Sequence, residues 1–219
     1  MESRRINADL TLDPLGNVKG SVKIIMNGPE ALRWRQLNLT SSPEEVKHQF
    51  NEMLRGLLPQ GISGEVDHFQ GLESSVTNLG AFVTVAGQLG TMTGKRITIP
   101  AFFFNSISKT QFVNDAKRES AIDLHYAEQV IDDVVYHLPV GFTVEGAPPA
   151  VQLPWSNRAA LVVQTTSVPG TIEVKQIFAR AFVLLDPSEF SSLPDFYRKI
   201  ATTDQQELIL AKGAIATGN

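Results

Sequence analysis

The chain has no cysteine among its 219 residues. It therefore cannot form a disulfide, bind a metal through a thiolate or use a cysteine nucleophile. It also has no excess of positive charge, because 19 lysine and arginine residues stand against 23 aspartate and glutamate residues. Binding to a nucleic-acid backbone requires a basic surface. We therefore exclude cysteine chemistry and do not expect a nucleic acid as a partner.

Long apolar runs are missing as well. The densest one, residues 179–185, has the length of a strand, whereas a membrane helix needs about 20 apolar residues. Arg4 and Arg5 are not followed by the apolar segment of a signal peptide. We therefore expect no membrane span, and either a cytoplasmic protein or a fragment whose export signal lies upstream. Because a strand pattern already begins at Ile6, a fragment of a longer protein is the preferred interpretation.

The sequence is instead rich in short segments in which apolar and polar residues alternate. Alternation of this kind is typical of half-buried strands. It predicts a hairpin over residues 6–26, turned by the proline, glycine and asparagine of residues 13–17. Further strands are expected at residues 65–69, 82–86, 96–99, 122–126, 134–138, 142–145, 159–165, 171–185 and 207–210. Residues 101–111 contain three consecutive phenylalanines without a period, which favours a buried connection.

Two helices are expected. Ser42 is a typical N-cap, Pro43 suits the first helical position and Glu45 completes a capping box. Apolar residues then recur at spacings of three and four up to Leu57, which places them on one helix face. Ser192 begins a similar pattern and predicts a short C-terminal helix.

This pattern predicts a mainly β (α+β) fold with antiparallel β-sandwich-like sheets, one well-capped helix in the N-terminal half and a short C-terminal helix. About ten strands are expected, and the alternating strand–helix units of a doubly wound sheet are missing. The pattern lapses near residues 106–117, which suggests a division into residues 1–111 and 112–219. One continuous domain is the alternative.

Sequence motifs for catalysis are incomplete. Residues 87–96 lack the glycine spacing of a phosphate-binding loop, and residues 61–64 lack the serine elbow of a hydrolase. His125 and His137 could share a site with Glu128, Asp132 or Asp133 if their strands pair, but solvated histidines are the preferred interpretation. The two aspartates are expected at a turn that faces water. We therefore expect no catalytic residue, no metal site and no cofactor, and a hydrolase is kept only as a third hypothesis.

Two clusters join a tryptophan to arginines and are the candidates for ligand binding. Cation–π contacts of this kind can recognise a peptide or a sugar. The candidate residues are Arg33, Trp34 and Arg35 in the first cluster and Trp155 and Arg158 in the second. Ordinary packing of arginine on tryptophan is the preferred explanation.

A set of colinear motifs lies at residues 6–35, 93–100, 112–113, 117–118, 133–145 and 196–210. In this order and spacing the motifs resemble the C-terminal region of bacterial transglutaminase-like proteins, in which β-rich domains of unknown function flank a transglutaminase core. The resemblance spans about residues 6–212. It departs from the family at Ala121, where many members have a proline.

The resemblance implies a partner rather than an activity. The chemistry of the family belongs to a papain-like core with a cysteine nucleophile, a histidine base and an aspartate, and none of its motifs occurs in this chain. The expected function is that of a non-catalytic accessory domain, which packs beside an upstream core or shapes access to it, in the periplasm or at the cell surface. The alternative is a stand-alone peptide- or glycan-binding module that uses Trp34 or Trp155.

Overall fold

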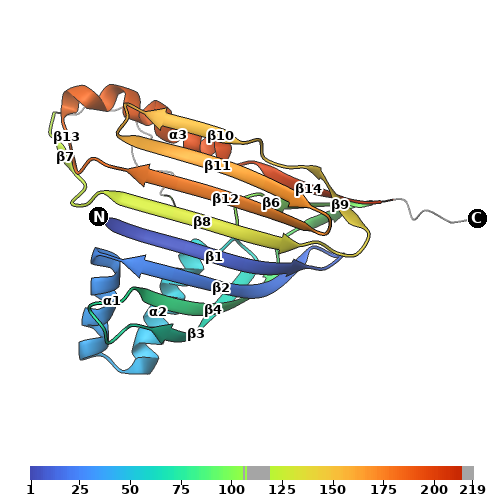
Figure 1. The fold of residues 1–219 in the computed structure, drawn as a ribbon, viewed down its shortest axis with the longest axis horizontal. Coiled ribbons are helices and arrows are strands. Elements are labelled where there is room, and N and C mark those ends of the chain that lie inside the picture. The colour runs from blue at the N-terminus through green and yellow to red at the C-terminus, as the bar shows by residue number, and fades with distance from the viewer. Residues whose placement is uncertain (106, 108–118, 214–219) are drawn as a thin grey trace, which may run out of the picture.

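The structure, a computed structural model, describes residues 1–105, 107 and 119–213. Within these residues it contains fourteen strands, three α-helices and one 3-10 helix (Figure 1). The N-terminal elements are β1 (Glu2–Leu12), β2 (Asn17–Asn27), α1 (Pro29–Thr40), α2 (Pro43–Leu57), β3 (Ile62–Gln70), β4 (Leu79–Gln88), β5 (Thr91–Thr93) and β6 (Arg96–Pro100). The others are β7 (Ile122–Asp123), β8 (Glu128–His137), β9 (Phe142–Gly146), β10 (Val151–Trp155), β11 (Ala159–Val168), β12 (Thr171–Arg180), β13 (Leu184–Leu185), η1 (Pro187–Ser192), α3 (Leu193–Thr203) and β14 (Glu207–Lys212).

Eight strands form one long sheet in the order β10-β11-β12-β8-β1-β2-β4-β3. Neighbours in this sheet are antiparallel, with the exception of β1 and β8, which are parallel. The predicted hairpin of β1 and β2 is confirmed, and so is the mainly β fold with antiparallel sheets. The parallel pairing joins strands from the two sides of residues 111 and 112 in one sheet. The division of the chain into two domains stays a prediction.

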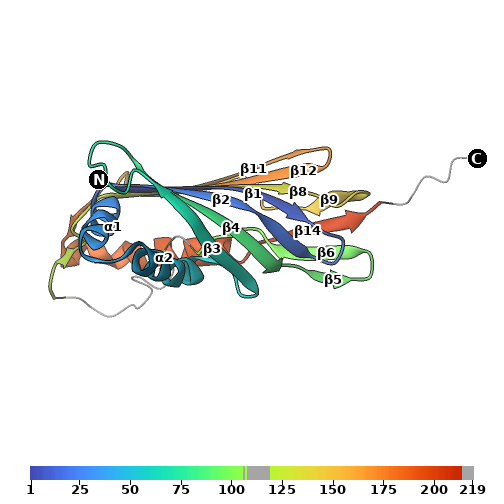
Figure 2. The same cartoon turned by 90° about the horizontal axis from the view of Figure 1, so that it is seen from below.

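The helices and a second sheet cover one face of this long sheet. The second sheet has the order β5-β6-β14-β9, and β13 and β7 form a small third one. Figure 2 shows α1, α2, α3 and the second sheet on the same side of the eight-stranded sheet. We call this side the covered face and the opposite side the open face.

The covered face carries the apolar residues of the strands. One core lies under β1, β2, β4, α1 and α2, and the other lies under β11, β12 and α3. Fully buried members of the first core include Ile6, Leu10, Ile24 and Phe50. Burial of such side chains is the main favourable contribution to folding. The eight strands are therefore held against the helices and the second sheet from one side.

The best-predicted helix is α2. The hydroxyl of Ser42 accepts a hydrogen bond from the backbone N–H of Glu45 at 3.2 Å, as expected of an N-cap. The helix ends at Leu57, as predicted. The buried connection at residues 101–105 is also confirmed, since Ala101, Phe103 and Phe104 are buried and outside any strand. The rest of that prediction, apart from residue 107, and the motifs at 112–113 and 117–118 lie outside the described residues.

Three sequence predictions were wrong in detail. Helix α1 was not expected, because it buries only Ala31 and Trp34 and has no apolar stripe. The strand predicted at residues 122–126 is only two residues long, since His125 adopts a φ of 60° that a strand does not allow. Strand β12 ends at Arg180 rather than at residue 185, because Leu184 and Leu185 leave the long sheet and pair with β7 as the separate strand β13.

The helix α3 begins near the predicted place but without the predicted cap. Ser192 makes no side-chain capping bond and has helical backbone angles. A capping box occurs instead at the start of η1, between Asp186 and Glu189. Within the described part of the chain, no helix is long and apolar enough to cross a membrane.

Candidate functional site

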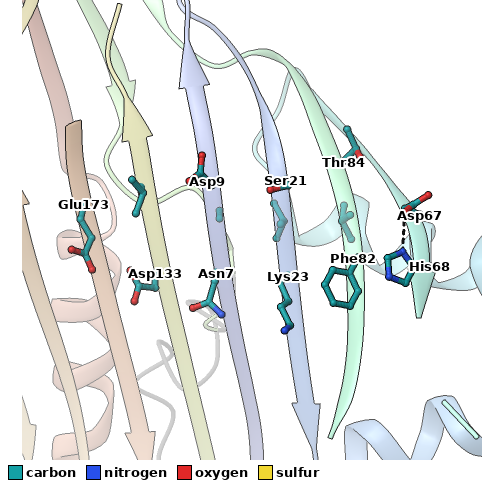
Figure 3. A pocket seen from close by; sticks show the side chains of 14 residues that line it. Asn7, Asp9, Ser21, Lys23, Asp67, His68, Phe82, Thr84, Asp133 and Glu173 are labelled. Carbon is teal, nitrogen blue, oxygen red and sulfur yellow. Dashed lines mark hydrogen bonds and ion pairs between the residues drawn. The ribbon is translucent and has the colours of Figure 1, made fainter. Parts of the chain in front are cut away.

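The open face holds a broad groove of about 740 Å³. Figure 3 shows the side chains that line it. They come from six neighbouring strands, β12, β8, β1, β2, β4 and β3. The lining residues are Asn7, Ala8, Asp9, Ser21, Val22, Lys23, Asp67, His68, Phe82, Val83, Thr84, Asp133, Val135 and Glu173. Because side chains alternate along a strand, Asn7 and Asp9 point into the groove. The lining residues Ala8, Val22 and Val83 are buried, and their side chains point to the covered face.

The strand register aligns the groove residues in rows across the sheet. Asp133 lies beside Asn7, Asn7 beside Lys23, and Lys23 beside Phe82, which in turn pairs with His68. A second row runs from Glu173 through Val135, Asp9 and Ser21 to Thr84. Each row crosses strands that are far apart in the sequence, so the groove exists only in the folded sheet.

Two carboxyl groups meet at one end of the groove. Asp133 accepts a hydrogen bond from the ammonium group of Lys175 at 2.7 Å. A hydrogen bond between Glu173 and Asp133, then partial burial and then the charge of Asp133 raise the pKa of Glu173 above its ordinary value. A raised pKa of this kind is typical of a carboxyl group beside a second carboxyl group. Asp133 and Glu173 therefore lie close together in the lining of the groove.

An aromatic ring lies near the other end of the groove. The imidazole of His68 stacks on Phe82, with ring centroids 4.4 Å apart and an angle of 7° between the planes. The ammonium group of Lys23 lies 5.1 Å from the Phe82 centroid. Asp67 contacts His68 at 2.8 Å (Figure 3, dashed line). This end of the groove thus combines an apolar surface with groups of both charges.

The histidine–carboxylate site that pairing of strands could have formed is not present in the described residues. His125 precedes β8, whereas His137 is the last residue of this strand and contacts Asp9 at 3.0 Å. Both histidines are exposed, as the preferred interpretation expected. No group of three potential metal-binding side chains occurs among the residues described.

The two neighbouring aspartates do not lie at a turn. Both are inside β8, and alternation sends them to opposite faces. Asp133 faces the groove, whereas Asp132 lies on the covered face and is only 5% exposed. The prediction that both face water at a turn was wrong, because the strand begins at Glu128, several residues earlier than expected.

The first tryptophan cluster packs inside the molecule. Trp34 is 3% exposed, and its ring lies 5.0 Å from that of Phe50 in α2. The guanidinium of Arg33 lies 5.8 Å from the Trp34 ring. Arg35 donates to the carbonyl oxygens of Gly71 and Thr77 and so fastens the β3–β4 loop to α1. The indole of Trp34 therefore has no free ring face for a ligand.

The second cluster has a similar role in the other core. Trp155 is 6% exposed and donates its indole N–H to the Ser192 hydroxyl at 3.0 Å. Arg158 forms an ion pair with Glu189 and lies 5.9 Å from the Trp155 ring. Arginine packing on tryptophan, the preferred explanation, describes both clusters. Neither cluster lies on the open face. The sequence did not predict the open face as a candidate site.

Comparisons with known proteins give one family and one solved structure. Residues 95–210, just over half of the chain, match the family described as "Domain of Unknown Function with solved-structure structure (DUF3858)". No curated protein matches the chain. The similar solved structure is a crystal structure of a "putative protease" from Parabacteroides distasonis, with 13% identity and a TM-score of 0.43. That match covers 53% of this chain and 23% of the other, so this chain corresponds to about a quarter of that protein's length. On the strength of the match over residues 95–210, the chain belongs to the DUF3858 family.

Proposed function

We propose that the chain is a non-catalytic accessory domain that docks beside a transglutaminase-like core of the same polypeptide. The colinear motifs from about residue 6 to residue 212 support this proposal, because they resemble the region that follows such a core. The chain itself has no cysteine and so cannot supply the nucleophile of such a core. In this proposal the core performs the chemistry, and the domain braces it or shapes access to its cleft.

The observation that carries the proposal is that the other described elements cover only one face of the eight-stranded sheet. One face packs against three helices and a second sheet, whereas the described residues leave a groove of about 740 Å³ on the other face. A broad, mixed surface of this kind suits contact with another folded unit better than enclosure of a small substrate. The groove therefore favours an interaction domain.

The location of the protein follows from the same resemblance. Transglutaminase-like proteins of this type are exported, so we place the domain in the periplasm or at the cell surface. A fusion of the full-length gene product to alkaline phosphatase, which is active only after export, tests this placement.

The alternative function, a stand-alone module that binds peptide or glycan through Trp34 or Trp155, is not favoured. Both indoles are buried in the two hydrophobic cores. A sugar or peptide that stacks on an aromatic side chain needs one exposed ring face. The accessory domain therefore remains the function that the geometry supports best.

The first test of the proposal is the reading frame upstream of Met1. An in-frame core that encodes cysteine, histidine and aspartate motifs supports the proposal, and a stop codon with a promoter directly upstream contradicts it. The second test mixes the 219-residue chain with that core, expressed separately, and measures complex formation by titration calorimetry. We expect a complex, and we expect the chain alone to release no ammonia from a glutamine-containing peptide. Ammonia release by the chain alone would overturn the proposal.

A further inference from the structure

We propose that the open face binds an extended segment rich in lysine or arginine, which lies across the strands from β12 to β3. The source of this segment rests on the proposed function, because we assign it to the surface of the partner core. The binding chemistry rests on the groove alone.

The charge of the groove points to a basic partner. Its lining contains four carboxylate side chains and one lysine. The carboxylates are those of Asp9, Asp67, Asp133 and Glu173, and the lysine is Lys23. Lys175 at the rim neutralises part of this charge through Asp133, and the groove still keeps an acidic excess. Complementary charge favours the encounter with a basic segment and excludes an acidic one.

The carboxylates are spread over the length that an extended segment would cover. Six strands at a spacing of about 4.8 Å place Glu173 in β12 and Asp67 in β3 about 24 Å apart. An extended chain rises about 3.3 Å per residue, so about seven residues span this distance. Alternate side chains of such a segment point toward the sheet. Their cationic groups can then reach Asp133 and Glu173 at one end, Asp9 in the middle and Asp67 at the other end.

The apolar part of the groove suits the long stems of lysine and arginine. Phe82 and Val135 line the groove between the carboxylates. Lysine and arginine pack their methylene groups on such surfaces while their charged ends reach polar partners. Lys23 already lies beside the Phe82 ring in this manner, at 5.1 Å from the centroid.

Strand addition at a sheet edge is the other common way to bind an extended peptide, and the edges of this sheet do not favour it. At the β3 edge, Asn51 of α2 accepts from the Val66 N–H at 2.9 Å, and Lys47 donates to the Asp67 carbonyl at 2.6 Å. The β10 edge contains Pro154, which has no N–H to donate. The face of the sheet is therefore the better binding surface.

The test uses the full 219-residue chain and a fluorescent heptapeptide in which lysine alternates with threonine. Fluorescence anisotropy measures its Kd at low salt, together with that of a glutamate–threonine heptapeptide. We expect the lysine peptide to bind and the glutamate peptide not to bind. Because the contact is electrostatic, its Kd should rise steeply when the salt concentration increases.

Three variants assign the binding to the groove. The double variant D133N/E173Q should weaken binding of the lysine peptide about tenfold, since it replaces two carboxyl groups that attract cations by neutral amides. K23A should tighten binding, because it removes the one lysine of the lining. The matched control is E207Q, which neutralises an exposed carboxylate on β14, outside the groove. It should change the Kd less than about twofold.

The outcomes separate this inference from the proposed function. Equal binding of both peptides, or equal loss in D133N/E173Q and E207Q, overturns the inference. If the core binds the wild type and D133N/E173Q equally well, the accessory function stands, but the open face is not the docking surface. If the lysine peptide binds in the groove but no complex with the core forms, the site for a basic segment stands, but the core is not the partner.

Discussion

The two faces of the eight-stranded sheet are made by the same strands and have opposite properties. In β1, Ile6, Ala8 and Leu10 are buried on the covered face, whereas Asn7 and Asp9 line the groove on the open face. In β2, Val22 and Ile24 are buried, and Ser21 and Lys23 line the groove. The covered face is continuous with two apolar cores, and the open face presents charge to the solvent.

This difference separates stability from recognition. Side chains on the covered face remove apolar area from water, and their loss leaves a cavity. Side chains on the open face keep their contact with water, so their replacement leaves the folded state almost unchanged. Evolution can therefore alter the open face, and with it the partner, at little cost to the fold.

The largest expected effect is a difference in stability loss between two substitutions on neighbouring strands, one of a buried isoleucine and one of an exposed threonine. Ile24 is fully buried on the covered face of β2, and Thr84 lies on the open face of β4. Ile24→Ala should lower the free energy of unfolding by about 2–5 kcal/mol. Thr84→Ala should change it by no more than about 0.5 kcal/mol. Urea unfolding of both variants measures the difference, and losses of similar size would contradict the distinction between the faces.

A polar side chain on the covered face should give the next largest effect. Gln176 of β12 is 3% exposed and donates to a carboxylate oxygen of Asp204 at 2.7 Å. Gln176→Leu removes this donor from a partly buried carboxylate, so we expect a loss of about 1–3 kcal/mol in urea unfolding. The control is Gln164→Leu in β11, where the side chain is exposed and stability should change by about 0.5 kcal/mol or less. Equal losses would indicate that the bond to Asp204 is not structural.

Much of the fold could be predicted from local patterns in the sequence. The alternation in β1 and β2 and the cap at Ser42 are local signals, and the structure contains both features. Helix α1 was missed because its amphipathic pattern is weak, with Trp34 and Ala31 its only buried residues. The parallel pairing of β1 with β8 joins residues more than a hundred positions apart. No local pattern encodes such a contact, since it depends on how the whole sheet assembles.

The candidate site was less predictable than the fold. Asn7, Asp9 and Lys23 were visible as the polar members of alternating strands. What could not be seen is that Asp133 and Phe82 lie in the same row, because the row depends on strand order and register. Trp34 and Trp155 were candidates because they are rare aromatic residues beside arginines. Both are buried, so these pairs serve packing.

A smaller effect is expected at Trp155, which lies at the end of β10 and is buried in the second core. If this residue serves packing, Trp155→Phe loses the hydrogen bond to Ser192 and should cost about 0.5–1.5 kcal/mol in urea unfolding. In the Ser192→Ala background the same replacement should cost less, because the bond is already absent. A loss of the same size in both backgrounds would show that this hydrogen bond does not contribute.

The smallest expected effect is a pH dependence on the open face. The hydrogen bond with Asp133 is the largest cause of the raised pKa of Glu173, and Lys175 partly opposes the shift. The folded protein thus holds this proton more tightly than the unfolded chain does. The resulting contribution to stability is complete below the ordinary pKa of glutamate and is lost as the pH rises through the raised value.

Glu173→Gln removes this titration. The stability of the variant relative to the wild type should therefore increase between about pH 4 and about pH 7 in urea unfolding. The same comparison reports on the groove, because Asp133→Asn should return the pKa of Glu173 toward its ordinary value in an NMR titration. If Asp133→Asn leaves that titration unchanged, the two carboxyl groups act independently. Such a result would contradict our inference that Asp133 and Glu173 together attract a cation.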